Sequence, residues 1–180
     1  MKNKSKYNWK ATLINSVKVA FLVLIGCNIS AQELSDSLLS DTSKNTIHIV
    51  QGDEMVPLNG DINILNIIGN AKFRQDQVIL TCDQAIIESK IKFIKAVGNV
   101  VVNQGDSIQM YGDSLDYDGE SKIAIMRGNV RLIKEDMTLS APSLLYDMNT
   151  NIAYYTNGGT VVSKKNNNTL TSKKGYYYSN

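Results

Sequence analysis

The chain has 180 residues, of which 43% are hydrophobic and 20% are charged, with a formal net charge of +2. This length suits one domain with an apolar core, and the two cysteines and the single histidine, His48, offer no paired zinc ligands. There is no nucleophile elbow and no phosphate-binding loop. We therefore predict a protein that is not an enzyme, has no catalytic residues, and needs neither metal nor cofactor.

The N-terminus has the composition of an export signal. Five lysines and no acidic residue precede an apolar run at 19–25, which is too short to cross a bilayer comfortably. A signal peptide over residues 1–31 is therefore favoured over a transmembrane anchor. Two cleavage sites fit, one after Ala31 and the other before Cys27. In the second case residues 24–27 act as a lipobox, and Cys27 anchors a lipoprotein to the membrane.

Removal of the leader reverses the charge balance. All five leader lysines are lost, which leaves 14 basic side chains against 17 acidic ones, a net charge of about −3. The sequence pI of 8.4 therefore comes from the leader. The remaining chain has no basic excess that would favour nucleic acid or an anionic membrane, so no nucleic-acid partner is predicted.

The rest of the chain divides into an arm and a strand-rich region. Residues 32–45 are rich in Ser, Asp and Asn without an apolar period, which predicts a flexible arm. From residue 46 onward, short apolar runs alternate with polar residues between Gly, Asn and Asp turns. Val100 and Val102, for example, share one parity, and Asn103 lies on the other. Such strands bury one face, so residues 46–180 are predicted to be all-β.

A glycine-led motif recurs through this region at intervals of 29, 30 and 31 residues. Its four occurrences are Gly69-Asn70-Ala71, Gly98-Asn99-Val100, Gly128-Asn129-Val130 and Gly159-Thr160-Val161. A period of this size indicates stacked supersecondary units that share one continuous interior. The sequence therefore predicts an elongated stack of repeats of about 30 residues, the last of them incomplete at Asn180.

Several stretches of these repeats match a known pattern when they are taken together. They are Gly98–Asp106, Met110–Gly119, Arg127–Leu132, Met137–Pro142 and Leu170–Tyr177. In combination they resemble the OstA-like, or LptA-like, family of organic solvent tolerance proteins, over about residues 46–180. The first repeat departs from the pattern, since Cys82-Asp83 stands where a later repeat has Gly112-Asp113.

The resemblance implies a fold and a function. The implied fold is an elongated β-jellyroll, open at both ends, that resembles a β-solenoid. The implied function is periplasmic lipopolysaccharide binding and transport during outer-membrane biogenesis, with the lipid A acyl chains shielded in an apolar groove. Its implied partners are lipopolysaccharide and other jellyroll proteins, or a second copy of this chain. These jellyrolls would pair edge strands to form a bridge to the outer membrane.

The inward parity of the strands gives candidate residues for a lipid groove. They are Phe73, Leu80, Val100, Val102, Ile108, Met110, Leu115, Tyr117, Ile123, Val130, Leu132, Leu139, Leu144, Tyr146, Tyr154 and Val161. The candidates for edge pairing are Leu170, Thr171, Ser172, Tyr176, Tyr177 and Tyr178.

An alternative function remains open at this point, because the same apolar residues could pack against one another as a dry core. The protein would then be a structural or adhesive β-solenoid whose edges bind protein. The acidic residues near Asp116 do not favour calcium, since their spacing matches neither an EF-hand loop nor a glycine-rich nonapeptide repeat.

Overall fold

The computed structural model describes residues 45–178, and the prediction of an all-β chain is confirmed within this range. The leader, its cleavage sites at Ala31 and Cys27, and nearly all of the arm lie outside the described residues, as does Asn180. The described part holds no helix that could cross a membrane. Its strands are β1 (His48–Gln51), β2 (Glu54–Leu58), β3 (Asp61–Gln75), β4 (Val78–Glu88), β5 (Phe93–Gln104), β6 (Ile108–Asp118), β7 (Ile123–Lys134), β8 (Met137–Asp147), β9 (Ile152–Tyr155), β10 (Gly159–Ser163), β11 (Asn168–Ser172) and β12 (Gly175–Tyr178).

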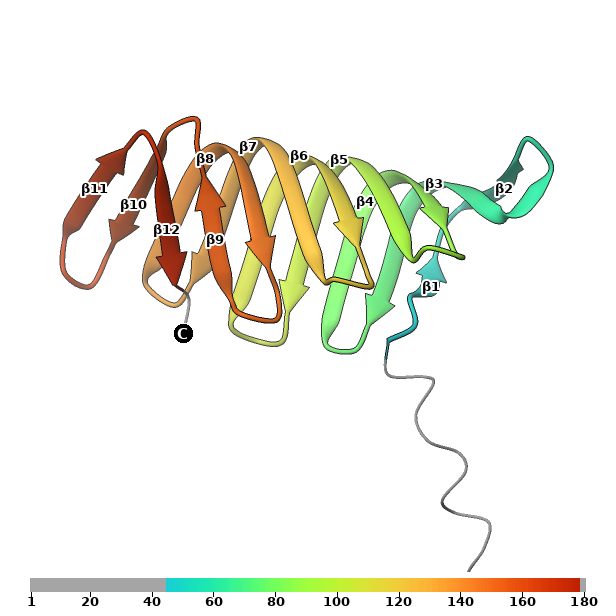
Figure 1. Cartoon of the computed structure of the whole chain (residues 1–180), viewed down its shortest axis with the longest axis horizontal. Coiled ribbons are helices and arrows are strands. Elements are labelled where there is room, and N and C mark those ends of the chain that lie inside the picture. Colours follow the sequence, from blue (N-terminus) through green and yellow to red (C-terminus); the bar gives the residue numbers. More distant parts are fainter. Residues whose placement is uncertain (1–44, 179–180) are drawn as a thin grey trace, which may run out of the picture. The chain divides into compact units, whose positions relative to one another are not determined.

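Six long antiparallel strands, β3 to β8, form the body, and each bends near its middle (Figure 1). Each long strand therefore contributes to two half-sheets that face one another. We call the half-sheet completed by β1, β10 and β11 half-sheet 1, and the half-sheet completed by β2, β9 and β12 half-sheet 2. The result is the open β-jellyroll that the family resemblance implied.

The bend, which we call the corner, is built by a Gly-Asn pair in alternate strands. Gly98 and Asn99 both have positive φ, 76° and 44°, a conformation that glycine and asparagine adopt most readily. The cross-strand register skips there, and Asn99 Nδ2 donates to Asp83 Oδ2 at 2.9 Å. The same unit recurs at Asp53 with Gly69-Asn70 and at Asp113 with Gly128-Asn129. The period seen in the sequence is therefore the spacing of these corners.

The fourth corner lies two residues earlier than the sequence analysis expected. Ser140 pairs with Arg131 on one side and with Thr160 on the other, so Thr160 occupies the place of Arg131 in the next repeat. Asn157 then occupies the place of the corner glycine. Gly159, the predicted fourth glycine, is buried within β10 and does not have positive φ. The glycine assignment was wrong because an asparagine holds this place.

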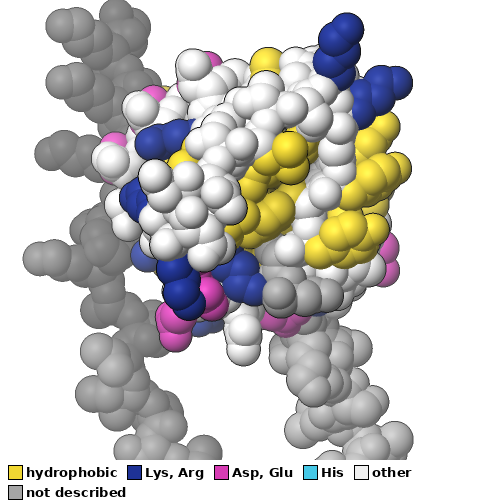
Figure 2. Space-filling view, turned by 90° about the vertical axis from the view of Figure 1, so that its left-hand side faces the viewer, with side chains coloured by type: hydrophobic (Ala, Val, Ile, Leu, Met, Phe, Trp, Pro, Cys, Tyr) yellow, Lys and Arg dark blue, Asp and Glu magenta, His cyan; other side chains and the backbone are white. Residues whose placement is uncertain are grey.

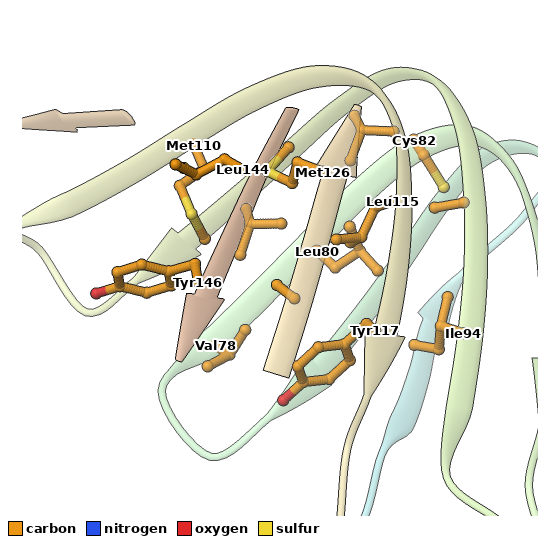
Figure 3. Close-up of a cluster of buried hydrophobic side chains, with 14 of the residues drawn as sticks. Val78, Leu80, Cys82, Ile94, Met110, Leu115, Tyr117, Met126, Leu144 and Tyr146 are labelled. Atoms are coloured by element: carbon orange, nitrogen blue, oxygen red, sulfur yellow. The ribbon is translucent and has the colours of Figure 1, made fainter. Parts of the chain in front are cut away.

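The two half-sheets bury their facing sides in one apolar core. Figure 3 shows side chains from β4, β6, β7 and β8 filling the space between them. Met110, Met126, Leu132 and Tyr146 have no measurable solvent exposure. Because full burial of one large apolar side chain contributes about 1.5–3 kcal/mol, this core is the main source of stability.

Two groove candidates point outward instead of inward. Tyr117 pairs with Ala124 across the β6–β7 turn, and residues in register share a face. The residue number of Tyr117 is odd and that of Ala124 is even. The inward-facing positions therefore change from odd to even numbers at this turn. Ala124 is therefore buried and Ile123 lies on the outer face. The β8–β9 turn acts in the same way, so Tyr154 lies outside.

Candidate functional site

The remaining groove candidates lie where the sequence placed them, in the interior. Thirteen of them are at most 3% exposed: Phe73, Leu80, Val100, Val102, Ile108, Met110, Leu115, Tyr117, Val130, Leu132, Leu139, Leu144 and Tyr146. Val161 is partly buried and packs against this core. The interior also includes residues that the sequence reading missed, among them Ala124, Met126, Ala153 and Tyr155. The pairing register of the strands on either side of each turn would have identified them.

The interior is filled in this conformation. Its side chains are almost fully buried, and a small pocket beside Phe73 and Tyr117 has a volume of about 10 Å³, barely enough for one water molecule. An acyl chain therefore cannot enter unless the two half-sheets move apart. Separation of the half-sheets would break the polar contacts between them.

Those contacts lie opposite the corners, where the turns of the two half-sheets meet along a line that we call the seam. Gln75 Nε2, at the end of β3, donates to the carbonyl oxygen of Gly119 in the β6–β7 turn at 2.8 Å. Gln75 Oε1 accepts from the Tyr117 hydroxyl at 2.5 Å. Burial raises the pKa of Tyr117 well above its ordinary value, and the nearby carboxylates of Asp76 and Asp118 add to that shift. The phenol therefore stays protonated and continues to donate.

A second glutamine repeats this contact one repeat further on. Gln104 Nε2, at the end of β5, donates to the carbonyl oxygen of Met148 at 2.9 Å. Between the two glutamine contacts, Lys122 Nζ forms an ion pair with Asp76 Oδ2 at 2.7 Å. Both glutamines stand at inward positions after Phe73 and Val102, which is an unexpected place for a polar residue in a strand. That pattern was the sequence signal for the seam.

The edge-pairing candidates lie at the end of the jellyroll formed by β10 to β12. Among the described residues β11 pairs only with β10, and β12 pairs only with β9, so each has an unpaired backbone edge. Leu170, Tyr176 and Tyr178 are 65%, 66% and 65% exposed. Figure 2 shows apolar side chains gathered over this end. Unpaired strand edges beside apolar side chains are templates for another strand.

Of the other edge candidates, Ser172 and Tyr177 are partly buried and Thr171 is exposed. Tyr177 packs against the core, Ser172 shares a hydrogen bond of 2.7 Å with Tyr155, and Thr171 shares one of 3.2 Å with Thr160. At the opposite end, β1 and β2 each pair only with β3 within the described range. Both ends of the described jellyroll are therefore open.

Other reactive groups are few in the described residues. Cys82 is buried, and burial raises the pKa of its thiol to about 11, so the thiol is almost wholly protonated at neutral pH. Among the described side chains, no group of three or more His, Cys, Asp or Glu residues could hold a metal ion.

Three comparisons place the chain among known proteins. The model of the family described as OstA-like protein matches residues 44–180. Comparison with curated proteins gives no match. Among solved structures, the fold is similar to that of LptH from Pseudomonas aeruginosa, described as the LptA-homologous periplasmic component of its lipopolysaccharide transport device. The TM-score is 0.57 and the identity 14%, over 73% of this chain and 98% of the LptH chain. Because the family model covers most of the sequence, the chain belongs to the OstA-like protein family.

Proposed function

We propose that this protein is a periplasmic, non-enzymatic carrier of lipopolysaccharide that forms part of a bridge to the outer membrane. The observation that carries the proposal is the family match over residues 44–180. The matched residues form a jellyroll with one continuous apolar interior. Export through a signal peptide at residues 1–31, with Ala31 or Cys27 at the cleavage point, belongs to the same proposal.

Loading takes place through the seam in this proposal. Each hydrogen bond there contributes about 1 kcal/mol net, and an ion pair as exposed as that of Lys122 contributes less than about 1 kcal/mol. Transfer of roughly a dozen methylenes from water yields on the order of 10 kcal/mol per acyl chain, less ordering costs. The acyl chain also covers the apolar surface that separation of the half-sheets exposes. Lipid binding can therefore outweigh closure of the seam.

The filled interior favours a second function. A core whose side chains are almost fully buried is what a structural or adhesive β-solenoid requires. In that case the open edges bind protein, and the interior has no ligand. The two functions differ in whether the protein takes up lipid.

Native mass spectrometry tests the carrier function directly. The exported protein, purified from a Gram-negative periplasm, is measured before and after addition of lipopolysaccharide. A lipid adduct that exchanges with the added lipopolysaccharide supports the carrier. A single ligand-free mass that does not change supports the dry solenoid instead.

The same proposal assigns the edge strands β11 and β12 to partner jellyrolls or to a second copy of this chain. Replacement of Leu170 by Asp places a charge on an apolar side chain that edge pairing would bury, while Leu170 is 65% exposed in the free protein. We expect self-association or partner binding to weaken about tenfold or more, since burial of an unpaired charge is costly. Folding stability should hardly change. Analytical ultracentrifugation over a concentration series measures the association.

The matched control is Ile91→Asp, because Ile91 is 55% exposed but lies in the β4–β5 turn, away from the edge strands. It should leave association unchanged. If the two variants associated equally strongly, the proposal that the edge strands bind partners would be refuted.

A further inference from the structure

The outer face of the jellyroll carries a groove that the proposed function does not use. Its volume is about 1090 Å³, and it crosses half-sheet 1 beside the third and fourth corners. Ligand sites usually have volumes of about 300–1,000 Å³, so the groove is large enough for an oligosaccharide. We propose that it binds a saccharide that bears phosphate or carboxylate groups.

One wall of the groove is a row of side chains in register across the strands. Strand pairing places these residues side by side on the outer face. The row consists of Val101, Tyr111, Arg131, Ser140, Thr160 and Thr171. Most of these groups donate or accept hydrogen bonds, which suits the hydroxyls of a sugar and does not suit an acyl chain.

The opposite wall lies at the corners. It is open at the fourth corner, because the aspartate and asparagine that pair at the other corners are absent there. Pro142 takes the place of the corner aspartate and Gly158 that of the asparagine, so no carboxylate–amide hydrogen bond bridges the strands there. A Cβ atom placed on Gly158 would have no other atom within 4 Å. The break in the repeat therefore coincides with free space.

The charge of the groove points to an acidic ligand. Arg131 lies over the Tyr111 ring, 5.2 Å from its centroid, and no carboxylate of the described residues pairs with it. The carboxylate in the lining, Asp113, already accepts a hydrogen bond from Asn129 Nδ2 at 2.8 Å. A guanidinium binds phosphate and carboxylate through paired hydrogen bonds. Arg131 is thus the cation available to a ligand in this groove.

A peptide strand is a poorer occupant for this groove. Strands β5 to β8, which form most of its floor, are hydrogen-bonded to a neighbour on each side. They offer no free backbone edge for strand addition. Recognition over this floor therefore comes from side chains, and those present combine hydrogen-bonding groups and one cation with apolar surface, a mixture that suits the polar and apolar faces of a sugar.

The test measures glycan binding by the exported protein with isothermal titration calorimetry. One probe is deacylated lipopolysaccharide, which keeps its sugars and phosphates, and the other is a hexamer of a uronic acid. Binding of either probe supports the proposal, and the probe that binds identifies the source of the ligand. A neutral glucose hexamer should bind at least about tenfold more weakly. Absence of binding by both acidic probes at about 10 mM, or equal binding of the neutral hexamer, would overturn the proposal.

Two variants on the same strand locate the site. Arg131→Gln should weaken binding of the acidic probe about tenfold. Arg127→Gln is the matched control, since Arg127 also faces outward on β7 but pairs with Asp116, on the other side of the corner, at 2.8 Å. It should change binding less than about twofold, and equal losses in the two variants would refute the assignment. Both probes lack acyl chains, so this proposal does not depend on the proposed function and the two can fail separately.

Discussion

Replacement of Gly128 by Ala is expected to destabilise the protein by about 3 kcal/mol. A Cβ at this corner would overlap the Asp113 carboxylate, and the φ of 75° costs about 1–2 kcal/mol in an L-residue. Displacement of the carboxylate also weakens its hydrogen bond with Asn129, at about 1 kcal/mol. Thermal unfolding should show the loss as a fall in Tm on the order of 10 °C.

Gly158→Ala provides the matched control for that variant. Gly158 has a similar φ, 88°, but a Cβ there would meet no neighbour, so only the conformational cost of about 1–2 kcal/mol remains. The double variant Asp113→Gly/Gly128→Ala removes the overlap and should recover part of the loss through coupling of the two sites. If Gly128→Ala and Gly158→Ala proved equally stable, the corner contact would have no special role.

A covalent link across the seam is expected to abolish lipopolysaccharide uptake. Asp76 and Lys122 pair across the seam at 2.7 Å, so cysteines at these two positions can be joined by a short bismaleimide. The link prevents separation of the half-sheets, while the filled interior leaves no other space for acyl chains. Native mass spectrometry should show lipid adducts on the unlinked double variant, and at least about tenfold fewer on the linked one.

A link of the same length that does not cross the seam serves as the control. Lys92 and Glu120 form an ion pair at 2.6 Å between neighbouring turns of half-sheet 2, and cysteines there can be joined in the same way. This variant should keep its lipid uptake. Cys82 should not interfere, because it is buried and its thiol pKa is raised to about 11. Undiminished uptake by the protein linked across the seam would contradict loading through it.

The architecture could be predicted from sequence because its two main signals are local. Alternation along Val100 and Val102 depends only on strand geometry, and the Gly-Asn pairs reflect a backbone conformation available to few residues. Both signals act within a few residues of the chain. They were enough to give the fold class, the repeat and most of the buried face.

The errors arose where position depends on the pairing of strands. Ile123 and Tyr154 were placed inside from the alternation of residues along the chain, without the register of the paired strands. Ala124 and Ala153 are buried because register changes parity across the preceding turns. The outer groove was missed for a related reason. Arg131 and Thr160 are 29 residues apart, and only their shared partner on β8 places them in one row.

The corner also bears on how this protein can change in length. At three of the four corners an aspartate accepts a hydrogen bond from the asparagine of a Gly-Asn pair, so every unit contacts little beyond its neighbours in the stack. Duplication or loss of one whole repeat would therefore preserve the strand pairing and the corner contacts of the body, while the number of repeats would differ. Genetic change could thus adjust the length of the jellyroll in steps of one repeat, without redesign of its interior.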